Sequence, residues 1–318
     1  MFTLNEIQES VTRVSPYITR TPLVKSHILS DWLQTNIYLK MELLQVTGSF
    51  KPRGAFNQML LLPERAKNAG VVAVSGGNFA QAVAYAGSRL GVDTIICMPE
   101  YTPENYIIAT RSYGARVEFA KDFQSTIAKS KEFVQQGYTL LHAWDNTHQM
   151  CGNGTLGLEI LKDLPEITDI FISIGGGGLI AGIIVAIKSL NPAVRIWGVE
   201  TAGSETMGAA MEAGKVVQIT PKSLAKTLGA HYIAQEALNL AQQHLEELVI
   251  VTDEEAVADQ IYMLEKAKVL SELAASCTLS AANRLKGRFG KDQHVVLLLC
   301  GGNETLKNMN SYRELLAH

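Results

Sequence analysis

Apolar residues along the chain follow the pattern of alternating strands and helices. Short β-branched runs predict buried strands at Val71–Val74, Thr94–Met98, Arg116–Phe119, Tyr138–Leu141, Asp169–Ile174, Arg195–Glu200 and His294–Leu299. Segments with a helical period predict helices at Asn78–Leu90, Pro103–Tyr113, Phe123–Gln136, Leu179–Leu190 and Ala274–Lys286, with others ending near Lys162 and beginning at Asp253. Strands that are apolar on both faces and separated by helices belong to parallel sheets covered on both sides. The pattern therefore predicts an α/β fold with parallel or mostly parallel sheets flanked by helices.

The order of these elements also predicts a division into domains. The strand-and-helix set between about residues 70 and 145 predicts a small sheet of its own, because it lies inside a longer alternating pattern. The chain then leaves a larger domain and later returns to it. We expect a large domain from residues 1–65 and 146–318 and a small domain from residues 66–145.

Composition narrows the functional class. A net charge of -3 on 318 residues gives no electrostatic footprint for nucleic acid or an anionic membrane. The four cysteines form no CxxC pair and the seven histidines no HExxH, which argues against a zinc site. A polar N-terminus and the lack of an uncharged apolar stretch of about 20 residues predict neither a signal peptide nor a membrane span. We expect a cytoplasmic protein without nucleic-acid or membrane partners.

A run of four glycines, Gly175, Gly176, Gly177 and Gly178, follows one predicted strand and leads through Leu179 into a predicted helix. Such a loop presents backbone N–H groups at the positive end of a helix dipole, which predicts a phosphate site. The spacing of Gly176, Gly178 and Ala181 also fits a dinucleotide-binding turn, with Glu200 as the ribose-binding acid. The loop alone leaves a nicotinamide-binding protein open.

Lys51 is the candidate nucleophile. It begins a helical stretch in the segment TGSFKPRGA, residues 47–55, where its neighbours are small or apolar. A helix N-terminus disfavours positive charge and so lowers the pKa of an amine towards the neutral form that Schiff-base chemistry requires. A lysine there predicts covalent catalysis on a carbonyl, which a dinucleotide-binding protein does not explain.

A third segment, Ser75-Gly76-Gly77-Asn78-Phe79, also lies between a predicted strand and helix. Its backbone donors are suited to a carboxylate, and the Asn78 amide to a phenolic oxygen. An ordinary capped helix start is an equally good interpretation of this segment by itself.

Taken in order, the three segments resemble the fold-type II pyridoxal-phosphate (PLP) enzymes, and more narrowly the serine/threonine dehydratase and serine racemase family. TGSFKPRGA resembles the family's lysine motif, SGGNFAQAVAYA (75–86) its substrate loop and GGGGLIAG (175–182) its phosphate loop. CGNGTLGLEIL (151–161) and LLLCGGN (297–303) resemble two further family motifs. The resemblance runs from about Thr21 to Asn303. It implies a two-domain fold like that of the tryptophan synthase β chain, and a homodimer.

The resemblance also implies roles for individual residues. Lys51 would carry PLP as a Schiff base, and Phe50 would pack beside its ring. Asn78 would bond the ring's 3'-oxygen and Cys300 would lie at the pyridine nitrogen. The phosphate would be held by the glycine run and the residue after it, Gly175, Gly176, Gly177, Gly178 and Leu179. The substrate carboxylate would be held by the loop of Ser75, Gly76, Gly77, Asn78 and Phe79.

Several positions depart from the family pattern, mostly near the expected substrate end. Phe79 replaces the usual histidine, Asn153 a common glutamine, and Ala143-Trp144 a Pro-Phe pair, while Leu273–Ser276 differs from the usual run after Glu272. Gly76 stands where racemases carry a serine that acts as an acid. Glycine transfers no proton, which argues against racemisation.

The family's divalent-cation site gives a further departure. Glu200 and Ser204 align with two of its ligands, but Thr206 replaces the third, an aspartate. Loss of one carboxylate weakens such a site, which argues against a bound divalent or monovalent cation. Glu200 is equally well interpreted as a solvated strand end.

The sequence thus predicts a lyase, a PLP-dependent ammonia-lyase that converts L-threonine or L-serine to a 2-oxo acid and ammonia in amino-acid catabolism. We expect no C-terminal regulatory domain of the biosynthetic type. A 3-hydroxyaspartate ammonia-lyase, a dehydratase of hydroxyectoine utilisation and a serine racemase stay open as alternatives. So does a PLP-binding protein with little catalysis.

Overall fold

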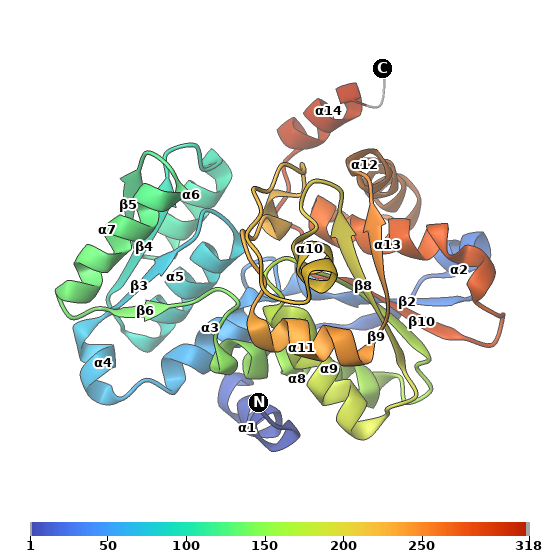
Figure 1. The fold of residues 1–318 in the computed structure, drawn as a ribbon, viewed down its shortest axis with the longest axis horizontal. Coiled ribbons are helices and arrows are strands. Elements are labelled where there is room, and N and C mark those ends of the chain that lie inside the picture. Colours follow the sequence, from blue (N-terminus) through green and yellow to red (C-terminus); the bar gives the residue numbers. More distant parts are fainter. Residues whose placement is uncertain (1, 316–318) are drawn as a thin grey trace.

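The computed structural model describes residues 2–315, which form an α/β fold built around two separate sheets (Figure 1). The larger sheet has the strand order β1-β2-β10-β7-β8-β9 and the smaller one the order β5-β4-β3-β6. The strands are β1 (Leu23–Lys25), β2 (Asn36–Met41), β3 (Val71–Val74), β4 (Thr94–Pro99), β5 (Arg116–Ala120), β6 (Thr139–Leu141), β7 (Asp169–Ser173), β8 (Arg195–Thr201), β9 (Leu245–Val251) and β10 (His294–Leu299). The predicted fold class is confirmed.

Helices cover the large sheet on both faces. One side carries α13 with α12 and α2, and the other carries α8, α9, α11 and α1 (Figure 1). The helices are α1 (Leu4–Val14), α2 (His27–Leu33), α3 (Lys51–Leu60), α4 (Glu64–Ala69), α5 (Asn78–Leu90), α6 (Glu104–Ser112), α7 (Phe123–Gln135), α8 (Thr147–Asp163), α9 (Gly178–Leu190), α10 (Thr206–Ala213), α11 (Gln235–His244), α12 (Asp253–Tyr262), α13 (Leu273–Arg284) and α14 (Leu306–Leu315).

The large sheet is parallel except at one edge, where β1 pairs antiparallel with β2. Its central strands β7 and β10 are buried except at His294, the first residue of β10, because both faces are covered. Within the described chain no helix has the length and apolar character needed to cross a bilayer.

The small sheet is entirely parallel and contains β3, β4, β5 and β6. Helix α5 contacts β3 and β4, α6 contacts β5, and α7 contacts all four strands. The separate sheet between Val71 and Leu141 is therefore observed. The domain boundaries proposed near residues 65 and 145 stay a prediction. Helix α3 contacts both α8 of the large unit and α5 of the small one, and so lies at their junction.

Candidate active site

Lys51 is the first residue of α3, and its amine is enclosed by the junction of the two units. The Nζ atom donates a hydrogen bond to the Ala143 carbonyl oxygen at 3.1 Å. It lies 4.9 Å from the centre of the Phe50 ring and 5.7 Å from that of Phe79. Burial lowers the pKa of Lys51 to about 8, against the opposing effect of Cys300 and Glu272. An amine in this setting is neutral in a useful fraction of molecules near neutral pH.

The glycine run forms the turn from β7 to α9, as the sequence predicted. Gly177 has a left-handed backbone with φ +89°, and a side chain on it would meet Ala237 at 2.5 Å. Within the described chain the backbone N–H groups of Gly175, Gly176 and Gly177 donate no hydrogen bond. Free N–H groups at a helix start form an anion site.

Trp144 lies directly against this glycine run. A Cβ atom on Gly176 would overlap the indole ring, and one on Gly178 would lie 2.8 Å from the Trp144 carbonyl oxygen. The indole Nε1 is buried and has no hydrogen-bond partner in the described chain. Trp144, one of the departures from the family pattern, therefore lies at the glycine run.

Cys300 follows β10 and lies at the same end of the sheet as the glycine run. Its sulfur accepts from Ser173 Oγ and donates to the Ala274 carbonyl oxygen, both at 3.5 Å. Burial raises the pKa of Cys300 to about 12, so the thiol is uncharged at neutral pH. Its carbonyl oxygen accepts the Phe50 N–H at 3.0 Å, which connects it to the residue before Lys51.

Asn78 begins α5, and its amide is held by residues of the large unit. Its Nδ2 donates to both Glu272 carboxylate oxygens at 2.9 and 3.0 Å, and its Oδ1 accepts from Asn303 at 2.8 Å. The Thr227 hydroxyl donates to Glu272 at 3.1 Å. Burial raises the pKa of Glu272 to about 7.

Sequence reasoning assigned no role to Glu272 or Thr227. Glu272 is 4% exposed and directly precedes α13, whose residues are almost all buried. Glu272 could have been found from the sequence, because it is an isolated acidic residue directly before an apolar helix. Thr227 lies in a three-residue helix, Lys226–Leu228, and no sequence pattern marked it.

The segment from Ser75 to Phe79 joins β3 to α5 beside Lys51. Phe79 is buried, and the Gly77 N–H donates to Ser75 Oγ at 3.2 Å. A Cβ atom on Gly76 would lie 2.7 Å from the hydroxyl oxygen of Thr102. A side chain at position 76 would therefore overlap Thr102.

The structure corrects the interpretation of Glu200 as a solvated strand end. Glu200 is fully buried at the end of β8, and its two oxygens accept the N–H groups of Met207 at 2.7 Å and Gly208 at 2.9 Å. Burial raises the pKa of Glu200 to about 8. The carboxylate thus caps α10, because it bonds N–H groups of the first helical turn.

Thr206, which stands in place of the aspartate ligand, donates its hydroxyl to the Ala230 carbonyl oxygen at 2.9 Å. Among residues 2–315, no group of three or more His, Cys, Asp and Glu side chains comes together to hold a metal. The residues around Glu200 therefore do not fit the cation site that the resemblance implies.

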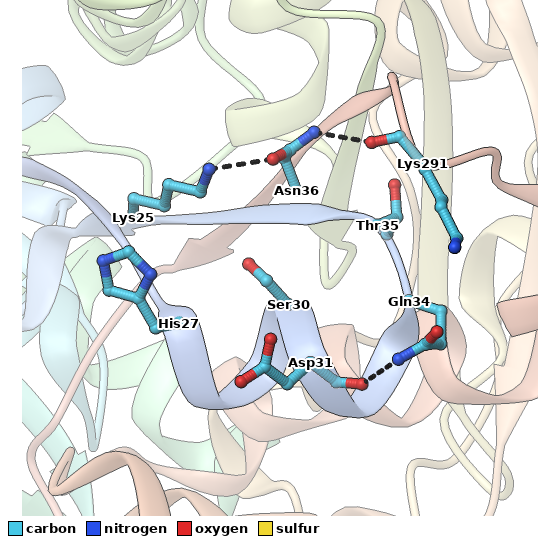
Figure 2. Close-up of a pocket in the computed structure, with 8 residues that line it drawn as sticks. All are labelled: Lys25, His27, Ser30, Asp31, Gln34, Thr35, Asn36 and Lys291. Atoms are coloured by element: carbon cyan, nitrogen blue, oxygen red, sulfur yellow. Dashed lines mark hydrogen bonds between the residues drawn. The ribbon is translucent and has the colours of Figure 1, made fainter.

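A surface hollow lies at the end of the large sheet that faces away from Cys300 and the glycine run. Figure 2 shows Lys25 bonded to Asn36, and Asn36 bonded to the Lys291 carbonyl oxygen. Asn36 begins β2 and Lys291 precedes β10, so the hollow is at the amino ends of these strands. Open α/β sheets bind ligands at the carboxyl ends, where Cys300 and the glycine run lie. The hollow is separate from the site.

Comparison with known proteins agrees with this geometry. The model of a family described as pyridoxal-phosphate dependent enzyme matches residues 14–301. The chain is 37% identical over 307 residues to an L-threonine ammonia-lyase of Thermotoga maritima, covering 95% of this chain and 76% of that protein. It is 34% identical over 317 residues to a catabolic L-threonine dehydratase of Staphylococcus aureus, covering 98% and 92%.

The structure of maize serine racemase is similar over 99% of both chains, with a TM-score of 0.92 and 28% identity. The family match spans most of the chain and includes Lys51, the glycine run and Cys300. The chain therefore belongs to the pyridoxal-phosphate dependent enzyme family.

Proposed function

We propose that this protein is a PLP-dependent ammonia-lyase that eliminates the β-hydroxyl of L-threonine or L-serine. The products are a 2-oxo acid and ammonia. The observation that carries the proposal is the Lys51 amine, which is buried against Phe50 and Phe79 next to an uncharged Cys300 thiol. The threonine-specific names of the Thermotoga maritima and Staphylococcus aureus relatives support this substrate.

The residues present fit the cofactor at each of its polar ends. Lys51 would hold it covalently, and the free N–H groups from Gly175 through Leu179 would hold its phosphate. The Asn78 amide, which Glu272 and Asn303 hold in place, would bond the ring's phenolic oxygen. Cys300 would lie at the pyridine nitrogen.

When bound, PLP withdraws electrons from the Cα atom of an amino acid. Once the substrate's amino group has replaced Lys51 on the cofactor, the neutral Lys51 amine would take the Cα proton, and this proton balances loss of the β-hydroxyl as water. The released enamine would hydrolyse to the 2-oxo acid and ammonia. The neutral Cys300 thiol supplies no negative charge to keep a pyridinium protonated. That favours prompt expulsion of a leaving group over accumulation of a carbanion.

The chain's own residues also direct specificity. The Ser75–Phe79 segment would take the substrate carboxylate through its N–H groups, while the buried Phe79 ring makes the neighbouring surface apolar. A second carboxylate there would lose hydration without gaining a partner. This supports threonine over 3-hydroxyaspartate, and Gly76 supports deamination over racemisation. The expected homodimer stays a prediction, to be checked by light scattering.

The test is formation of 2-oxo acid by the PLP-loaded protein from L-threonine, L-serine, the 3-hydroxyaspartate isomers and the hydroxyectoine breakdown product. Lys51→Ala is the control, because it removes the base while the glycine run still binds phosphate. We expect turnover of L-threonine and none in the control. Bound PLP without turnover of any of these substrates would favour the PLP-binding protein with little catalysis.

A further inference from the structure

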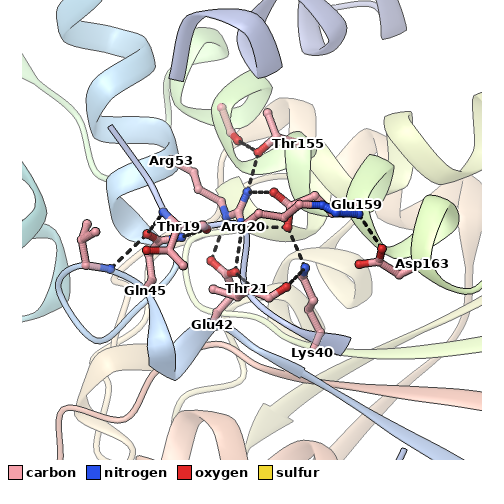
Figure 3. Close-up of polar contacts among 12 residues, drawn as sticks. Thr19, Arg20, Thr21, Lys40, Glu42, Gln45, Arg53, Thr155, Glu159 and Asp163 are labelled. Atoms are coloured by element: carbon pink, nitrogen blue, oxygen red, sulfur yellow. Dashed lines mark hydrogen bonds and ion pairs between the residues drawn. The ribbon is translucent and has the colours of Figure 1, made fainter. Parts of the chain in front are cut away.

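Beneath the first turn of α3 lies a buried cluster of four charged side chains, Lys40, Glu42, Arg53 and Glu159, here called the buried ion cluster (Figure 3). The side chains of Lys40, Glu42 and Arg53 are 0% exposed and that of Glu159 is 15% exposed. The two positive and two negative charges balance. Buried ions are tolerated when their charges and hydrogen bonds are matched in this way.

Arg53 is the centre of this cluster and uses all of its donors. It bonds both Glu42 oxygens through Nε and Nη2, each at 2.8 Å, and both Glu159 oxygens through Nη1 at 2.7 Å and Nη2 at 3.0 Å. The second Nη1 hydrogen goes to Thr155 Oγ1 at 3.1 Å. A guanidinium has five N–H groups, so none is left free. The planar fork fixes the side chain in both position and orientation.

The first turn of α3 has no side-chain cap, and its backbone is tied to the large sheet where the Phe50 N–H bonds the Cys300 carbonyl oxygen. The N-cap residue Phe50 makes no side-chain capping bond, and the first turn of α3 holds no acidic residue. On the side of α8, a Cβ atom on Gly152 would overlap the Arg53 carbonyl oxygen. The first turn of α3 is thus pressed closely against α8 and held by the Arg53 side chain. Lys51 is two residues away in the same turn.

We propose that Arg53 is a positioning residue for Lys51. Its five hydrogen bonds fix the first turn of α3 and so hold the Lys51 amine at the Ala143 carbonyl oxygen, where it meets PLP. This inference rests on the proposed role of Lys51 as the cofactor lysine. The competing explanation is a purely structural ion pair, in which the buried ion cluster stabilises the fold without controlling Lys51.

Lys40 provides a matched control. It lies on β2, away from α3, and bonds the Thr21 carbonyl oxygen at 2.7 Å and Glu159 at 2.6 Å. Lys40→Met and Arg53→Met each remove one buried cation and leave the same net charge of minus one in the cluster. A structural role predicts similar effects of both changes. A positioning role predicts that only Arg53→Met alters the chemistry of Lys51.

The measurement is the rate at which apoenzyme forms an imine with added PLP, followed by its visible absorption. Borohydride trapping and peptide mapping then locate the attachment, and urea unfolding gives stability in parallel. We expect Arg53→Met to slow imine formation by on the order of tenfold or more, since misplacing a reacting group by about 1 Å has effects of this size. Lys40→Met should stay within about twofold of wild type despite a similar loss of stability. Equal slowing in both variants would overturn the proposal.

Two milder variants carry the test if Arg53→Met fails to fold. Arg53→Lys keeps the charge but has only three donors on one nitrogen, so imine formation should stay slow. Thr155→Val removes a single acceptor and should give a smaller slowing in the same direction. Wild-type rates in both would refute the positioning role. None of these assays needs an amino-acid substrate, and labelling of a lysine other than Lys51 in wild type would instead contradict the proposed function.

Discussion

The amide nitrogen of Asn78 donates to both carboxylate oxygens of Glu272, at 2.9 and 3.0 Å, although the two residues are 194 positions apart. One belongs to the helix that follows the small sheet's first strand, and the other precedes α13 of the large unit. The bond orients the amide that we assign to the cofactor ring. It also brings a titratable carboxylate, with its pKa raised to about 7 by burial, near the Lys51 amine.

Glu272→Gln is expected to lower the pKa of Lys51 further, because the charged carboxylate favours the protonated amine. The pH dependence of imine formation between apoenzyme and PLP reports this pKa. Glu200→Gln is the matched control, since Glu200 is also a buried glutamate but caps α10. A midpoint that moves equally in both variants, or upward in Glu272→Gln, would contradict the prediction.

The cap at Glu200 predicts a specific pH dependence of stability. Burial raises the pKa of Glu200 from 4.5 to about 8, so the folded state holds a proton that the unfolded state has already lost. The group's contribution is fully present below about pH 4.5 and is lost as pH rises to about 8. We expect wild type to lose roughly 4 kcal/mol relative to Glu200→Gln between pH 5 and 9, because about three pH units of this range lie between the unfolded and folded pKa values of Glu200. Urea unfolding at both pH values measures this difference, and a constant difference would refute it.

The surroundings of Gly76 predict deamination without racemisation. Incubation with L-serine should give pyruvate and almost no D-serine by chiral chromatography. Gly76→Ser alone should not introduce racemisation, because its Cβ would lie 2.7 Å from Thr102 Oγ1 and force a shift of the loop. Adding Thr102→Ala makes room, and the double variant should racemise more than either single one. Comparable D-serine and pyruvate rates in wild type would be incompatible with this argument.

Phe79 predicts a substrate preference that one substitution should change. Wild type should have a higher kcat/KM for L-threonine than for 3-hydroxyaspartate, because the buried ring offers no partner for a second carboxylate. Phe79→His supplies a donor and should move the ratio towards 3-hydroxyaspartate by roughly 1–3 kcal/mol, the usual size of single-contact discrimination. Phe79→Leu serves as the control, since it changes volume without adding a polar group. A wild-type preference for 3-hydroxyaspartate would show that a cation reaches the site from elsewhere.

Local patterns in the sequence were sufficient for the strands that are apolar on both faces. Strands β3, β4, β7 and β10 lie within one or two residues of their predicted bounds. Short continuous apolar runs of this kind are typical of buried strands. Strands β1, β2 and β9 were not predicted, and β1 is only three residues long. Polar and charged residues interrupt β2 and β9, where Lys40 is buried and pairs with Glu159, and Glu247 lies at the surface.

The candidate site shows the same limit. Lys51, the glycine run and Asn78 stand at strand-to-helix or loop-to-helix turns, where local sequence marks both backbone geometry and chemistry. Glu272, Thr227 and Thr102 come close to these residues only through long-range packing. Neither periodicity nor a local motif depends on such contacts. The partner of a single acidic or hydroxyl residue therefore cannot be predicted from the sequence around it.

The strand order of the large sheet has a consequence for how the chain becomes an enzyme during synthesis. β10 lies between β2 and β7, so the hairpin of β1 and β2 joins the rest of this sheet only through the last strand. While residues 294–299 of a nascent chain are still inside the ribosome, the large sheet is incomplete, even if the small sheet has already formed. Cys300 and β10, which position the segment before Lys51, therefore join the large sheet after its other strands have been made. Until they do, the Lys51 amine lacks one side of its site.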